Sequence, residues 1–242
     1  MKTKLLITLS FVLFVGVLSS RAQDVKLPQN LKDSSKILPV KGRYGKQFNQ
    51  VITFGDYTTS KIKKGWTKTS SFTFGAKSVS KSSQKFSFTQ FGPNSAEAEV
   101  TCLGELSKAD IEIIKNLFAV GMDFKNCFTG SIQLVNDSVP WEFIILDPDS
   151  KPDTESSKGF VRKGNEPMIE LFGITELEGK KIPKMLQTLI GWEYRLNGES
   201  IGVVSLYNKG TVVLKEGISE EFKIVIASLS TALLVRTDLT DQ

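Results

Sequence analysis

The feature that most constrains the fold of this chain is an apolar segment near its carboxyl end. Ten of the fourteen residues in Phe222–Val235 are apolar, and the exceptions are Lys223, Ser228, Ser230 and Thr231. Ser219 is a candidate N-cap, and Glu220 and Glu221 suit the positive end of a helix dipole. A helix that is apolar on most of its faces must be surrounded by protein or by lipid.

The length of this segment decides between the two surroundings. A helix of this size spans little more than about 20 Å, whereas the hydrocarbon core of a bilayer is about 30 Å thick. The sequence therefore predicts a buried central helix. A C-terminal membrane anchor is the alternative.

Most of the remaining chain shows the period-two alternation of half-buried antiparallel strands. The predicted strands are Gln47–Phe54, Lys61–Ser70, Phe72–Phe74, Phe86–Phe88, Ala96–Cys102, Ser131–Val135, Trp141–Leu146, Phe160–Arg162, Met168–Phe172, Trp192–Leu196, Ile201–Tyr207 and Thr211–Leu214. Asn197-Gly198 supplies the two positive-φ residues of a type I′ hairpin turn. One short helix is expected over Ser107–Phe118, and Lys180–Ile190 suits either a strand or a short helix.

The amino terminus has the pattern of a secretory signal peptide. Lys2 and Lys4 precede the apolar run Leu5–Leu18, and the small residues Ser20 and Ala22 follow it. We expect cleavage after Ala22, which makes the mature chain an exported protein, with an uncleaved anchor as the alternative. The style of the signal suits the periplasm or outer envelope of a Gram-negative bacterium, with no transmembrane segment after cleavage.

Removal of this peptide changes the charge of the chain. The whole sequence has 31 Lys and Arg against 26 Asp and Glu, a net charge of +5. Residues 1–22 hold Lys2, Lys4 and Arg21 and no acid, so the mature charge is 28 − 26 = +2. Because a nearly neutral domain gains little from counterion release, nucleic acid is not an expected partner.

Composition also excludes several kinds of catalytic site. The chain has no histidine, which rules out Ser-His and Cys-His nucleophile pairs and any metal site with a histidine ligand. Its two cysteines cannot build a four-thiolate zinc site. We expect no cofactor, no metal and no catalytic residue.

The two cysteines leave one question open. An exported protein lives where thiols can oxidise, so Cys102 and Cys127 are a possible disulfide. Alternation places Cys102 on the same face as Ala96, Ala98 and Val100, which predicts a buried side chain. A pair of buried thiols is the equally open alternative.

A basic stretch supplies the candidate ligand-binding residues. Residues 41–90 hold ten Lys and Arg against one acid, and residues 91–157 hold four Lys against twelve acids. The candidates are Lys61, Lys63, Lys64 and Lys68, which surround Trp66. They suit the headgroup of an anionic lipid or another envelope anion. A solvated outer face, balanced by neighbouring acidic strands, is the alternative reading.

A carboxylate pair is a catalytic chemistry that the composition leaves available. A pair of acids can act on glycans without histidine. The strand-borne acids are Glu97, Glu99, Glu142 and Glu170, and alternation places them opposite the apolar face, in solvent. The run Asp147–Asp153 lacks the glycine and terminal glutamate of a calcium loop, so it is read as a plain acidic loop.

Two segments carry a resemblance to a known family. The run Trp192–Val204 is similar to the late hairpin, and Ile218–Val235 to the core helix, of the tubby C-terminal-like superfamily, which includes tubby proteins, phospholipid scramblases and LURP-one-related proteins. The resemblance implies a closed antiparallel barrel of about twelve strands around a buried C-terminal helix. It also implies a non-enzymatic protein, with lipid-related roles in some members. It covers about the last fifty residues, and no basic residue of tubby proteins is carried over.

The sequence thus predicts a mainly β (α+β) protein with one short inserted helix. Its expected parts are a signal peptide (1–22), a flexible leader (23–45) and a single barrel domain (46–242). The leading functional hypothesis is a non-enzymatic envelope binding module, with anionic lipid as a ligand. The alternatives are a structural or protein-interaction component of the envelope and, third, a carboxylate-dependent glycan-acting enzyme. Oligomeric state is not predicted.

Overall fold

The computed structural model describes residues 25–45, 49–65, 72–74, 77–79, 82–106, 127–146, 158–164, 166–183 and 186–240. The expected signal peptide, the expected helix at Ser107–Phe118, Lys68 and the acidic run Asp147–Asp153 lie outside these residues.

A single antiparallel sheet forms most of the molecule. Over the described residues it has thirteen strands: twelve follow the order β1-β15-β14-β13-β12-β11-β10-β9-β8-β7-β3-β2, and β4 pairs with β7 off this path. The strands are β1 (Ser35–Pro39), β2 (Thr53–Phe54), β3 (Tyr57–Thr59), β4 (Lys63–Lys64), β7 (Ser82–Phe91), β8 (Glu97–Leu106), β9 (Cys127–Leu134), β10 (Trp141–Leu146), β11 (Lys158–Lys163), β12 (Glu166–Ile174), β13 (Gly191–Leu196), β14 (Glu199–Ser205) and β15 (Thr211–Lys215). The short strands β5 (Phe72–Phe74) and β6 (Lys77–Val79) pair separately, and η1 (Pro93–Ser95) is a single 3₁₀ turn.

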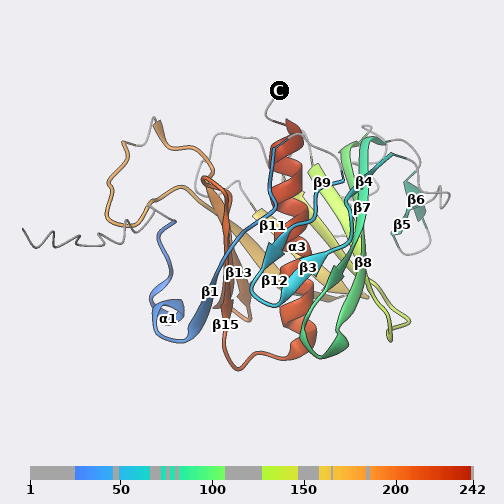
Figure 1. Cartoon of the computed structure of the whole chain (residues 1–242), viewed down its shortest axis with the longest axis horizontal. Coiled ribbons are helices and arrows are strands. Elements are labelled where there is room, and N and C mark those ends of the chain that lie inside the picture. The colour runs from blue at the N-terminus through green and yellow to red at the C-terminus, as the bar shows by residue number, and fades with distance from the viewer. Residues whose placement is uncertain are drawn as a thin grey trace, which may run out of the picture.

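The sheet curls into a nearly closed barrel around the C-terminal helix α3 (Glu220–Thr240), which Figure 1 shows at its centre. Every residue of α3 from 224 to 236 is buried. The predicted fold class is therefore confirmed, and the helix extends five residues beyond the predicted Val235. Because strands surround this helix on many sides, it needs no polar face, which explains its apolar sequence.

The predicted hairpin is also confirmed. β13 and β14 are joined by Asn197 and Gly198, whose φ angles are 51° and 80°. The ambiguous stretch Lys180–Ile190 forms neither a strand nor an α-helix over its described residues. Among the described residues of the predicted strands Gln47–Phe54 and Lys61–Ser70, strand pairing is limited to Thr53–Phe54 and Lys63–Lys64.

The described part of the segment expected to be a flexible leader, residues 25–45, is instead part of the fold, so that expectation is wrong for these residues. It forms α1 (Gln29–Lys32) and β1, and β1 pairs with β15 from Ser35↔Lys215 to Pro39↔Thr211. Val25 and Leu31 are buried with Val203 and Val213 in a second apolar cluster. Val203 and Val213 point away from α3, since side chains alternate along a strand and their neighbours Val204 and Val212 belong to the main core. The leader therefore covers the outer face of β14 and β15.

Candidate functional site: the barrel seam

The barrel has a seam where its two edge strands, β1 and β2, meet. One bridge joins them: the Lys41 N–H donates to the Thr53 carbonyl at 2.8 Å, and the Thr53 N–H donates to the Lys41 carbonyl at 3.0 Å. Beyond Thr53 the chain turns at Gly55 and Asp56 into β3, whereas β1 runs on beside β15. The seam is therefore joined at one end and parted at the other.

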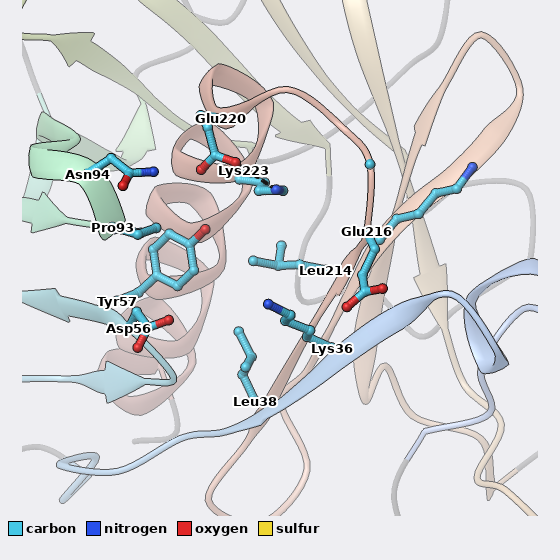
Figure 2. Close-up of a pocket in the computed structure, with 12 residues that line it drawn as sticks. Lys36, Leu38, Asp56, Tyr57, Pro93, Asn94, Leu214, Glu216, Glu220 and Lys223 are labelled. Carbon is cyan, nitrogen blue, oxygen red and sulfur yellow. Dashed lines mark hydrogen bonds and ion pairs between the residues drawn. The ribbon is translucent and has the colours of Figure 1, made fainter.

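A cavity of about 330 Å³ occupies the parted end. We call it the seam pocket, and Figure 2 shows side chains from both sides converging on it. It is lined by Lys36, Leu38, Asp56, Tyr57, Pro93, Asn94, Leu214, Lys215, Glu216, Gly217, Glu220 and Lys223. These residues come from β1, the β2–β3 turn and the start of β3, η1, the end of β15 with the two residues after it, and the first turn of α3. Its volume lies at the small end of the range for small-molecule sites.

Charges of both signs line the seam pocket in equal number, three lysines and three carboxylates. Lys223 is paired with Glu220 at 2.7 Å, and Lys215 is paired with Glu199 outside the pocket. Within the described part of the chain, Lys36, Asp56 and Glu216 have no ion-pair partner. The pocket thus keeps one cation and two anions that a ligand can neutralise.

Tyr57 forms the most enclosed part of the pocket wall. Only 5% of its surface is exposed, and its ring stacks on Phe54 with centroids 5.6 Å apart. Its hydroxyl points into the pocket (Figure 2) and has no hydrogen-bond partner among the described residues. Burial, together with the charges of Glu220 and Asp56, raises the pKa of Tyr57 to about 12. The hydroxyl therefore remains protonated at neutral pH and is available to donate or accept.

Apolar side chains also line the seam pocket, and one of them narrows the seam beside the charged groups. Leu38 lies across the seam against Gly55, where an added Cβ would come within 2.8 Å of the Leu38 Cδ2 atom. Gly55 also has a φ of +55°, so a side chain there would be strained as well as crowded. Leu214 and Pro93 extend the apolar lining. A ligand in the pocket would meet apolar contacts and charged groups within one small volume.

The lysines predicted from the sequence do not line this pocket. Lys61, Lys63 and Lys64 are exposed, and the last two form β4 beside β7. The residues that do line it were missed because they come from separate segments and one of them, Lys36, belongs to the expected leader. The nearest local signal was the helix start at Ser219, whose hydroxyl accepts from the Phe222 N–H at 3.3 Å.

The two cysteines are buried and are not joined by a disulfide. Cys102 faces Gly130 across β8 and β9, whereas Cys127 faces Leu146 on β10. Cys127 and Gly130 are three residues apart on one strand, so their side positions lie on opposite faces of the sheet. Cys102 belongs to the main core, and burial raises the pKa of its thiol. The predicted burial of Cys102 is thus confirmed. Of the two alternatives for the cysteines, the structure has a pair of buried thiols and not a disulfide.

The strand-borne carboxylates are not gathered into a site. Glu97, Glu99 and Glu170 are exposed, as predicted. Glu142 is buried, which corrects the expectation that it lies in solvent, and it accepts from Arg162 Nη2 at 3.0 Å and Nε at 3.2 Å. Across the described ranges, no group of three or more Cys, Asp or Glu residues is placed to hold a metal ion.

No family model, curated protein or solved structure matches this chain. In the part of the chain that the structure describes, no helix has both the length and the apolar character needed to span a membrane.

Proposed function

We propose that this chain is an exported, non-enzymatic binding module of the cell envelope that takes its ligand at the seam pocket. The observation that carries the proposal is Tyr57, a buried side chain whose hydroxyl lacks a partner among the described residues and points into the pocket. This hydroxyl can donate to, or accept from, a polar group of a ligand that is held against the ring.

The charges around Tyr57 indicate the class of ligand. The pocket is formally neutral, so a simple anion or cation gains little from its overall field. Lys36 suits a carboxylate or phosphate, and Asp56 suits an ammonium group. Leu38 and Leu214 suit an apolar part between them. We therefore propose a dipolar ligand that carries both charges.

Binding of small dipolar probes tests this proposal. We would titrate leucine, glycerophosphoethanolamine and glycerol phosphate into the protein and follow backbone amide shifts by NMR. Saturable binding of a dipolar probe, weakened at least about tenfold in Lys36→Gln and Tyr57→Phe, supports the seam pocket. Lys26→Gln is the matched control, because Lys26 is exposed, pairs with Glu176 and does not line the pocket. An affinity that is the same in the wild type and in both pocket variants contradicts the proposal.

A second candidate function is adhesion to anionic lipid through Lys61, Lys63, Lys64 and Lys68. The exposure of the first three supports it, as does the proposed relationship to the tubby-like superfamily. Juxtamembrane lysines contribute about 1 kcal/mol each near an anionic surface, and salt screens this attraction. We expect the protein to sediment with phosphatidylglycerol vesicles but not with phosphatidylcholine vesicles.

The salt series decides whether that attraction is electrostatic. Binding to phosphatidylglycerol should fall as NaCl rises from 50 to 500 mM and should be weakened in the triple variant Lys61→Gln/Lys63→Gln/Lys64→Gln. The seam variants Lys36→Gln and Tyr57→Phe should leave it unchanged. Absent or salt-independent vesicle binding removes the lipid candidate.

A further inference from the structure

The edge of β1 that borders the seam pocket offers unpaired backbone groups. Even-numbered residues of β1 and its flanks bond toward β15: the Val40 N–H donates to the Gly210 carbonyl at 3.1 Å, and the Ser34 carbonyl accepts from Glu216 at 2.7 Å. Odd-numbered residues therefore point toward the seam. Lys41 confirms this parity, because its N–H and carbonyl both bond Thr53 across the seam.

Ile37 is the centre of this unpaired edge. Its N–H and carbonyl point to the same side as those of Lys41, but the opposite strand has already turned away at Gly55. No described residue bonds these two groups. Pro39 offers only its carbonyl, since proline has no N–H. The Ile37 side chain is 58% exposed, so no neighbour covers this part of the strand.

The seam pocket lies on the inner side of the same edge. The side chains of Lys36 and Leu38 flank Ile37 and line the pocket (Figure 2). A dipolar molecule held only by side chains would leave the Ile37 backbone groups unused. An extended peptide satisfies both features, because its backbone pairs with the strand while alternate side chains enter the pocket.

We infer that the ligand of the seam pocket is an extended peptide segment that adds to the edge of β1 as an antiparallel strand. This inference rests on the proposed function and names the class of ligand. The described strand pairs of the sheet are all antiparallel, so an added strand that runs antiparallel to β1 continues this pattern. The residue opposite Ile37 exchanges two hydrogen bonds with it and points outward.

The register of this pairing predicts the sequence of the peptide. In an antiparallel pair, the residue before the central one lies opposite Leu38, on the side of Asp56. The residue after it lies opposite Lys36. Charge complementarity therefore favours a basic residue before, and an acidic residue after, a central β-branched residue.

A second copy of this chain suits the edge less well than a separate peptide. β1 lies within its own seam, with the β2–β3 turn and the start of α3 on the other side of the pocket. Antiparallel pairing of two β1 strands about Ile37 would also place Lys36 opposite Leu38 rather than opposite an acid. A single extended segment brings no second barrel into the seam, and its sequence can place an acid opposite Lys36.

The test uses the full chain and the capped peptide acetyl-Lys-Val-Glu-Thr-amide. We expect saturable shifts of the Ile37 amide in NMR titration, and Lys36→Gln and Asp56→Asn should each weaken binding. The reversed peptide acetyl-Glu-Val-Lys-Thr-amide and the peptide N-methylated at valine should both bind at least about tenfold more weakly. Equal binding of either control overturns the inference.

The matched protein variants are Ile37→Pro and Ile37→Thr. Proline removes the seam-facing N–H without removing a bond to β15, whereas threonine keeps the N–H and the β-branch. We expect Ile37→Pro to lose about tenfold in affinity and Ile37→Thr to bind like the wild type. If Ile37→Pro does not fold, the N-methylated peptide tests the same hydrogen bond with unaltered protein.

The outcomes separate this inference from the proposed function. Lys36-dependent binding of leucine or glycerophosphoethanolamine without peptide binding overturns the peptide inference and leaves the pocket as a small-molecule site. If neither the dipolar probes nor the peptide bind to the wild-type protein, both the peptide inference and the proposed function are overturned. Dimerisation through β1, seen by sedimentation and abolished in Ile37→Pro, with no affinity for the peptide, also overturns the peptide inference.

Discussion

Tyr194 and Ser230 face each other inside the barrel, with the phenol oxygen 2.9 Å from the hydroxyl oxygen. Tyr194 belongs to β13 and Ser230 to the middle of α3, and both are fully buried. Burial raises the pKa of Tyr194, and the hydrogen bond with Ser230 opposes that shift only in part. A second polar contact lies one residue further along the helix, where the Thr231 hydroxyl donates to Gln90 Oε1 at 2.8 Å. These two contacts favour one axial position and one rotation of the apolar helix within its barrel.

The losses of stability from removing the two partners should therefore be less than additive. We expect Ser230→Ala to lower the free energy of unfolding by about 1–3 kcal/mol, because it leaves the Tyr194 hydroxyl buried and unsatisfied. The double variant Ser230→Ala/Tyr194→Phe should be less destabilised than the sum of the two single variants. Urea denaturation of the four proteins measures this difference. Additive losses would show that the hydrogen bond does not couple helix and barrel.

The raised pKa of Tyr57 predicts a loss of stability at alkaline pH. The unfolded phenol ionises near its ordinary value of 10.0, and the folded one near about 12, so between these values the unfolded state is the one that loses its proton. Stability attributable to Tyr57 is thus present below pH 10 and is lost as the pH rises toward 12, with a slope of at most about 1.4 kcal/mol per pH unit. Tyr57→Phe should remove this part of the slope in denaturation curves at pH 9, 10 and 11. An unchanged slope contradicts the assignment.

Local sequence signals predicted the helix and one hairpin well. α3 was predictable because ten apolar residues in fourteen leave a helix no solvent face. The β13–β14 hairpin was predictable because Asn197 and Gly198 adopt left-handed conformations at little cost. In both cases the determining physics acts within a few residues of the chain.

The seam pocket was not predictable in the same way. Lys36, Asp56 and Glu220 meet only because the barrel closes, and closure depends on strand pairs far apart in the sequence. β1 shows little alternation because it holds a lysine and a proline, residues that are common on exposed edges. Glu142 lies opposite the core, as its alternation with Trp141 and Phe143 requires. The burial of Glu142 on the outer face depends on which other residues cover that face. The alternation of apolar and polar residues along β10 does not predict this cover.

The buried pair of Glu142 and Arg162 should respond differently to single and double substitution. Both side chains are less than one-tenth exposed, and they lie directly opposite each other on β10 and β11. Arg162→Met should lower the free energy of unfolding by about 3–5 kcal/mol, because it leaves a buried carboxylate without its main cation. Glu142→Leu/Arg162→Met should recover much of that loss. Denaturation at two salt concentrations measures both effects, and a double variant no more stable than Arg162→Met contradicts the prediction.

The attachment of the amino-terminal segment to the barrel predicts how the chain is cut by trypsin. Leu31 of α1 is fully buried against the outer face of β14 and β15. The Glu216 N–H also donates to the Ser34 carbonyl at 2.7 Å, just before β1. A buried leucine cut back to alanine costs about 2–5 kcal/mol. Because that loss falls on a peripheral element, local opening of α1 and β1 should absorb much of it.

Leu31→Ala should therefore raise the rate of tryptic cleavage after Lys36 at least about tenfold, with little change in the melting temperature of the barrel. Mass spectrometry of timed digests identifies the cut and its rate. Leu186→Ala is the control, because Leu186 is 66% exposed and its truncation should leave the rate unchanged. Rapid cleavage after Lys36 in the wild type would contradict the attachment itself, since a strand paired with β15 does not enter a protease site without first leaving the sheet.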